Sequence, residues 1–114
     1  MVNIETFRQF ALSLAEATEQ PHFEKLSFRV NKKIFATLDL RINRAVLKLS
    51  ETEQSVFCSF DKSIIYPVNG AWGKQGWTIV ELKKIRRDML KDLVLTSYCN
   101  VAPKRLSTRY KTQQ

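Results

Sequence analysis

Residues 26–50 have the sequence LSFRVNKKIFATLDLRINRAVLKLS, in which apolar and polar residues alternate in three runs. The runs cover residues 26–30, 33–40 and 44–50. An asparagine stands in each of the two short segments between them, and asparagine tolerates the left-handed backbone that tight turns need. The pattern therefore predicts three antiparallel strands joined by turns.

The alternation also assigns side chains to two faces, because successive side chains of a strand point to opposite sides. The more apolar set is predicted to face the core: Phe28, Val30, Ile34, Ala36, Leu38, Leu40, Ala45, Leu47 and Leu49. The outer face is predicted to carry Ser27, Arg29, Lys33, Phe35, Thr37, Asp39, Arg44, Val46 and Lys48. Salt bridges across this outer face are expected to join Asp39 or Glu81 to Arg44 or Lys48.

Helical patterns surround these strands. Asn3 is expected to cap a helix that continues to about Thr18. Ser50 and Glu53 have the spacing of a capping box, which predicts a second, short helix. This short helix is expected to bury three apolar side chains, Val56, Phe57 and Phe60.

The second half of the chain adds strands at residues 64–68 and 77–82 and a final helix over about residues 86–98. Two terminal helices that pack on one face of a sheet form a stable two-layer arrangement. We therefore predict an α+β fold: a mostly antiparallel sheet of about five strands, with the N- and C-terminal helices on one face.

The chain has 114 residues and a formal net charge of +8. This length suits one domain, which we place at residues 1–102, followed by a basic tail at residues 103–114 that is expected to fray. No apolar stretch is long enough for a membrane span, and no secretory signal is recognisable. A cytoplasmic protein with reduced Cys58 and Cys99 is the expectation. The positive charge favours a polyanionic partner such as nucleic acid.

Catalytic chemistry lacks the necessary groups. His22 is the only histidine, and no nucleophile motif or second metal ligand accompanies it. The three glycines lie in the loop 69–76 between two strands, which fits neither nucleotide-binding fingerprint. We therefore predict a protein that is not an enzyme and that has no cofactor and no metal.

Several short motifs resemble the MmcQ/YjbR family over roughly residues 4–102. They are FALSL at 10–14, FRVNKKIFA at 28–36, LKL at 47–49, IIYP at 64–67 with Gly73-Lys74 and Trp77 after it, and Ser97-Tyr98. The resemblance implies a double-wing fold of frataxin-like layout, and members are described as predicted DNA-binding proteins. Many members have glycines where this chain has Asn31-Lys32, and a His and an Asn in the loop before the tryptophan, which this chain lacks.

The leading functional prediction is nucleic-acid binding, with DNA as the partner, through wing loops and the basic outer face of the sheet. The candidate binding residues are Arg29, Lys33, Phe35, Arg44 and Lys48 on the sheet, with Trp77 or Ile79 beside them, and Trp72 and Lys74 in the loop. Basic residues around exposed aromatic rings suit phosphates and stacked bases.

Alternatives remain open for the same residues. Charges on an uncovered sheet also keep it soluble and unpaired without any ligand. Trp72 can instead fold back as a lid on the core. The outer face can also form a homodimer or bind a protein or small ligand, because Phe35, Val46 and Ile79 are apolar.

Overall fold

The computed structural model describes residues 2–22 and 24–111, except for the side chains of His22 and Lys111. The described residues form a six-stranded antiparallel sheet with the strand order β1-β2-β3-β4-β6-β5. The strands are β1 (Thr18–His22), β2 (Lys25–Val30), β3 (Lys33–Asp39), β4 (Arg44–Lys48), β5 (Ile65–Pro67) and β6 (Trp77–Glu81). The helices are α1 (Ile4–Leu12), α2 (Glu51–Cys58), α3 (Ala71–Lys74), α4 (Arg87–Val101) and α5 (Lys104–Lys111).

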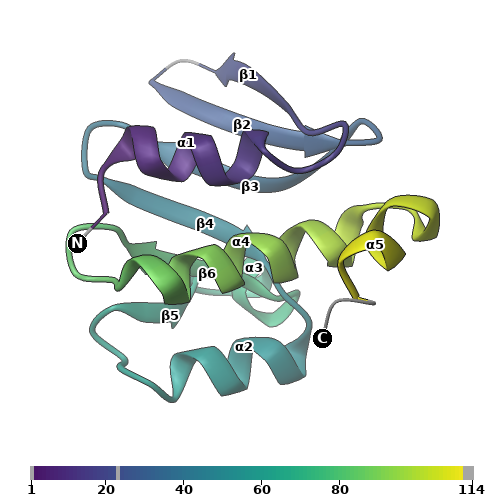
Figure 1. The fold of residues 1–114 in the computed structure, drawn as a ribbon. Helices are drawn as coiled ribbons and strands as arrows, with labels where there is room; N and C mark the ends of the chain where they lie inside the picture. The colour runs from purple at the N-terminus through teal and green to yellow at the C-terminus, as the bar shows by residue number, and fades with distance from the viewer. Residues whose placement is uncertain (1, 23, 112–114) are drawn as a thin grey trace.

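Helices α1 and α4 lie across the same face of the sheet, in front of it in Figure 1. Helix α2 packs beside the edge strand β5, and α5 packs against α4. The predicted α+β class, with terminal helices on one face, is therefore confirmed. The opposite face is called the open face below. No helix among residues 2–22 and 24–111 is both long and apolar enough to cross a bilayer.

Most side chains that were predicted to face the core do so. Seven of them are fully or almost fully buried: Phe28, Val30, Ala36, Leu38, Ala45, Leu47 and Leu49. Helices α1 and α4 cover them with another apolar set: Phe7, Ala11, Leu90, Leu93, Val94 and Tyr98. Two predictions are wrong, since Leu40 is exposed and Ile34 is only half-buried.

A β-bulge explains the second error and reverses the predicted position of Phe35. Phe28 pairs with Ala36, but the next residue of β2, Arg29, pairs with Ile34, so Phe35 has no partner in the ladder. An extra residue in one strand shifts the alternation of the side chains beyond it. Phe35 consequently points into the core with 0% of its surface exposed. Its predicted place on the outer face is wrong.

The bulge is held by α4. Ser97 Oγ donates a hydrogen bond of 2.6 Å to the Phe35 carbonyl and accepts one of 3.0 Å from the Lys48 amide. The ring of Tyr98 meets the ring of Phe35 edge-on, with centroids 5.6 Å apart. A buried serine on the helix thus satisfies backbone groups of two strands at the irregular position.

The predicted turns are confirmed by the backbone. Asn31 and Lys32 both have positive φ, at 52° and 67°, between β2 and β3. Asn43 has a φ of 52° between β3 and β4. Two consecutive left-handed residues match the twist of a hairpin, which is the reason asparagine is favoured there.

The N-terminal region differs from its prediction. Asn3 caps α1 as expected, because its side chain accepts a hydrogen bond of 2.8 Å from the Thr6 amide. The helix however ends at Leu12, and residues 18–22 form the edge strand β1. Pro21 obscured this strand in the sequence; proline is tolerated at a sheet edge, where one side of the strand needs no donor.

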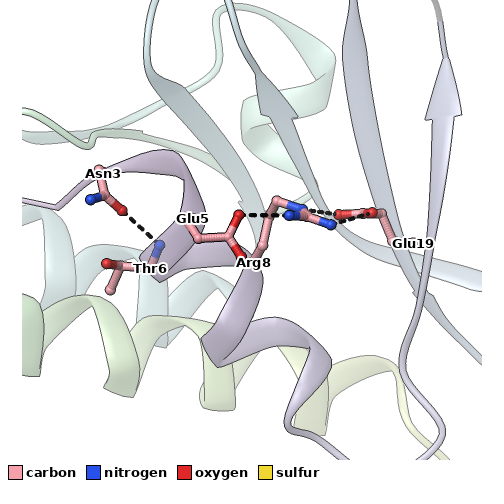
Figure 2. Close-up of polar contacts among 5 residues, drawn as sticks. All are labelled: Asn3, Glu5, Thr6, Arg8 and Glu19. Carbon is pink, nitrogen blue, oxygen red and sulfur yellow. Dashed lines mark hydrogen bonds and ion pairs between the residues drawn. The ribbon is translucent and has the colours of Figure 1, made fainter.

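An ion pair fixes α1 to β1 (Figure 2). Arg8 Nε lies 2.5 Å from one carboxylate oxygen of Glu19, and its Nη2 donates to the other oxygen at 2.9 Å. Glu5 accepts a further hydrogen bond of 2.6 Å from Arg8. The hydrogen bond from Arg8 holds the pKa of Glu19 below its ordinary value, against a smaller opposing effect of burial.

This lowered pKa predicts an acid-dependent loss of stability. Glu19 stabilises the fold above its ordinary pKa of 4.5, and this contribution disappears as the pH falls through the depressed value. Glu19→Gln should therefore lower the free energy of unfolding at pH 7 and have much less effect near pH 3. Urea unfolding at both pH values measures the difference, and a gap between the two proteins that does not change with pH would contradict the assignment.

The capping box of α2 is confirmed, since the Glu53 amide donates to Ser50 Oγ and the Ser50 amide donates to Glu53. Its predicted buried face is mostly wrong. Phe57 is half-buried, but Val56 and Phe60 are exposed at 55% and 62%. Helix α2 packs against β5 at the edge of the sheet and not across its centre, so it buries less of its surface than α4 does.

The expectation of a frayed basic tail is also wrong for residues 104–111, which form α5; residues 112–114 lie outside the described residues. Leu106 is buried, and the Tyr110 ring meets Tyr98 with centroids 5.4 Å apart. Both tyrosines also bind the backbone of Ala15, Tyr110 Oη as acceptor from its amide and Tyr98 Oη as donor to its carbonyl. Burial raises the pKa of Tyr98 to about 12, so its hydroxyl remains a donor even in moderately alkaline solution.

Candidate nucleic-acid interface

The strand register arranges the open face in three zones. One end carries Arg29, Ile34, Lys48 and Trp77; the middle carries Thr37, Val46, Ile79 and Tyr66; the other end carries Asp39, Arg44 and Glu81. Residues paired across antiparallel strands point to the same side of the sheet. Side chains that are paired in this way are therefore neighbours, although they come from different strands.

The first zone is aromatic and basic. Lys48 and Trp77 are direct partners across β4 and β6, and the Lys48 ammonium lies 5.7 Å from the centre of the Trp77 ring. The same ammonium donates a hydrogen bond to the carbonyl of Gln75. Trp72 of α3 meets Trp77 edge-on, with centroids 6.1 Å apart and an angle of 63° between the rings. Arg29, two strands from Lys48, completes what we call the basic–aromatic cluster: Arg29, Lys48, Trp72 and Trp77.

Trp72 does not fold back onto the core. Its side chain is 61% exposed. Lys74 lies elsewhere, in a shallow hollow that it shares with Glu51 and Gln54. The sequence placed Lys74 beside Trp72, but the short helix α3 turns the two side chains to different surroundings.

Two further candidate residues, Lys33 and Phe35, do not lie with the cluster. Lys33 is exposed beside the turn between β2 and β3, but its cross-strand partner is the inward-pointing Val30, so it leaves the sheet on the helix side. Its predicted place on the outer face is therefore wrong. Phe35 is buried, as described above, and cannot contact a ligand on the open face.

Arg44 remains on the open face but belongs to its opposite end. It forms the salt bridge that was predicted with Glu81, at 2.9 Å, and Tyr66 Oη donates a hydrogen bond to the same carboxylate. Burial alone would raise the pKa of Glu81, but the hydrogen bonds from Tyr66 and Arg44 keep it below its ordinary value. With its charge compensated in this way, Arg44 is a weak candidate for binding phosphate.

Sequence reasoning missed three features at this end of the open face: Ile34 beside Arg29, the carbonyl of Gln75 that holds Lys48, and the helix α3 that carries Trp72. Ile34 depends on the bulge, which alternation does not signal. Trp77, in contrast, was predicted beside the candidate residues of the sheet and lies there, alternating with buried Thr78 and Val80.

The helix side offers a different environment. A groove of about 540 Å³ lies between α2, α4 and α5, lined by Glu53, Phe57, Asp92, Leu95, Thr96, Cys99, Asn100 and Tyr110. Its two carboxylates disfavour a polyanion. Within residues 2–22 and 24–111, no three His, Cys, Asp or Glu side chains gather as a metal site would require. The side chain of His22, the one histidine considered for catalysis, lies outside the described residues.

Comparisons with known proteins agree with this fold. The chain is similar in structure to protein DR2400 of Deinococcus radiodurans, which contains a domain described as DUF419, with a TM-score of 0.79. The sequences are 21% identical, and the match covers 99% of this chain and 88% of the other, so it informs on the fold alone. No curated protein sequence matches the chain. A family model described as YjbR matches residues 12–100, most of the domain, and the chain therefore belongs to the YjbR family.

Proposed function

We propose that this protein is a non-catalytic module that binds nucleic acid, with DNA as its main partner, through the open face of the sheet. The observation that supports this most directly is the basic–aromatic cluster, which combines two cations with an exposed indole on the face of the sheet opposite α1 and α4 (Figure 1). The formal net charge of +8 adds a general attraction to polyanions.

The structure also restricts which variants test this function. Removal of residues 103–114 is not a clean test of the basic tail, because Leu106 and Tyr110 pack against the domain. Arg44 is equally unsuitable, because its loss would leave Glu81 without its ion pair. Arg29 and Lys48 are better choices, because no carboxylate depends on either of them in the contacts described above.

We expect wild-type protein to bind labelled DNA in fluorescence anisotropy and to lose affinity steeply between about 50 and 300 mM salt. Arg29→Gln/Lys48→Gln should weaken binding and reduce the slope of log K against log salt by about 1.5 to 2, the value for two phosphate contacts. The matched control is Lys62→Gln/Lys83→Gln, which removes the same charge near the other end of the sheet. Equal losses of affinity in both variants would mean that binding depends on the net charge of the protein and not on the basic–aromatic cluster. No binding at low salt would overturn the proposal.

A second candidate is self-association through the middle of the open face. Val46 and Ile79 are direct partners, Tyr66 also pairs with Ile79, and the three form a continuous, half-buried apolar strip. Such strips on an open sheet favour a partner of similar character. Analytical ultracentrifugation that finds a dimer unaffected by salt, and broken by Val46→Lys, would support this function instead.

A further inference from the structure

We infer that the basic–aromatic cluster takes single-stranded nucleic acid, one base of which stacks on the indole of Trp72. The inference rests on the proposed function and specifies its partner. Four features support it: the exposure of Trp72, the fixed backbone that carries it, the charges beside its ring, and the position of α1 and α4 on the other face.

The exposed ring of Trp72 is the first feature. Its contact with Trp77 is edge-on, at an angle of 63°, and 61% of the residue is accessible to solvent. An edge-on contact with one neighbour leaves most of the ring surface open. Every base has a flat aromatic face, so such a ring accepts a base without regard to its identity.

The close packing of the α3 backbone is the second feature. A Cβ atom on Gly73 would lie 1.8 Å from the Val68 carbonyl oxygen, so the helix backbone lies directly against the chain after β5. The Gln54 side-chain amide also donates to the Gly73 carbonyl at 3.0 Å. The backbone of Trp72 is therefore fixed before a ligand binds. Stacking of a base on Trp72 then costs less conformational entropy of the protein.

The charges beside the ring suit a sugar–phosphate backbone. Lys48 reaches over Trp77, and its hydrogen bond to Gln75 uses one of its three donors. Arg29 lies two strands away, a separation of about 10 Å for neighbouring strands spaced at about 4.8 Å. A strand that places a base on Trp72 can thus run its phosphates across the sheet towards Arg29.

Duplex DNA fits this surface less well. Its bases are stacked on one another, so none offers a face to Trp72 unless it is extruded at a cost of a few kcal/mol. Major-groove recognition requires a protruding helix or ribbon, whereas α1 and α4 lie on the opposite side of the sheet (Figure 1). The bases of a single strand are already free to stack, and their recognition requires no groove-binding helix.

The test compares a labelled single-stranded oligonucleotide with a duplex of the same length, at about 100 mM salt. We expect wild type to prefer the single strand by tenfold or more. Trp72→Ala should weaken single-strand binding about 5- to 150-fold, the range for one stacked base, and weaken duplex binding by a clearly smaller factor, so that the preference for the single strand falls. Trp72→Phe should keep most of the affinity. The exposed position of Trp72 makes all these variants compatible with folding, which circular dichroism verifies.

A fluorescence signal separates stacking from a general loss of contacts. Trp72 and Trp77 are the only two tryptophans, so Trp77→Phe leaves Trp72 as the sole indole. Its emission should be quenched when the single strand binds. Equal binding of both DNA forms, with no effect of Trp72→Ala, would overturn this inference and leave the proposed function standing. Absence of binding to either form would overturn the proposed function itself.

Discussion

Phe35→Ala is expected to lower the free energy of unfolding by about 3–5 kcal/mol, the usual cost of emptying a phenylalanine site in a core. Phe35 is fully buried and rests against the ring of Tyr98 at 5.6 Å. Its carbonyl also accepts the hydrogen bond from Ser97 that holds the bulge. The vacated volume lies between a strand and a long helix, which have little freedom to collapse into it.

Phe60→Ala is the matched control, because it removes the same atoms from a residue that is 62% exposed. It should change the free energy of unfolding by no more than about 0.5 kcal/mol. Urea unfolding followed by circular dichroism measures both variants. A mild effect of Phe35→Ala together with weaker DNA binding would mean that Phe35 lies on the outer face, as plain alternation predicts, and that the bulge does not exist.

The contrast between Phe35 and its neighbours shows which part of the fold was accessible to sequence reasoning. Alternation placed Ala36, Leu38 and Leu47 correctly, because an uninterrupted strand repeats every two residues. The bulge before Ala36 is stabilised by Ser97, which is more than sixty residues away in the sequence. A contact of this kind is invisible to a local pattern.

Distance in the sequence also explains the errors at both ends of the chain. The edge strand β1 contains Pro21 and owes its position to pairing with β2 and to the ion pair between Glu19 and Arg8. Residues 104–111 are polar and basic, yet Tyr110 anchors them on Tyr98 and Ala15. In both cases tertiary contacts outweigh weak local propensity.

The candidate site was only partly predictable for a related reason. Residue type identified Lys48 and Trp72 as candidates, and these two lie together. Arg44 and Lys74 lie apart from them because of the strand register and the helical turn of α3. Neither feature can be recognised from residue type alone. Of the salt bridges predicted from Asp39 or Glu81 to Arg44 or Lys48, the one between Arg44 and Glu81 forms. Asp39 lies opposite Arg44 but contacts Arg41 instead, so strand alternation identified the shared face and did not select the pair.

Gly76→Ala should have the other large effect, a loss of about 3 kcal/mol or more in the free energy of unfolding. Gly76 has a φ of 102°, which strains any residue with a Cβ atom. A Cβ there would also lie 1.8 Å from the Leu49 carbonyl oxygen, too close for any contact. Neither backbone can yield easily, because the Leu49 amide donates a hydrogen bond of 3.0 Å to the Gly76 carbonyl.

Gly70→Ala separates the two causes. Gly70 has a φ of 79°, but nothing lies within 4 Å of the position of its Cβ atom. It should therefore show the strain alone, about 1–3 kcal/mol for its φ of 79° and ψ of −149°, whereas Gly76→Ala should show strain plus the clash. Equal losses in thermal or urea unfolding would mean that Leu49 moves freely away from Gly76. Because Leu49 follows Lys48 and Gly76 precedes Trp77, such a movement would also displace the paired side chains of the basic–aromatic cluster. A Gly76→Ala protein that still folds should then bind single-stranded DNA more weakly than Gly70→Ala.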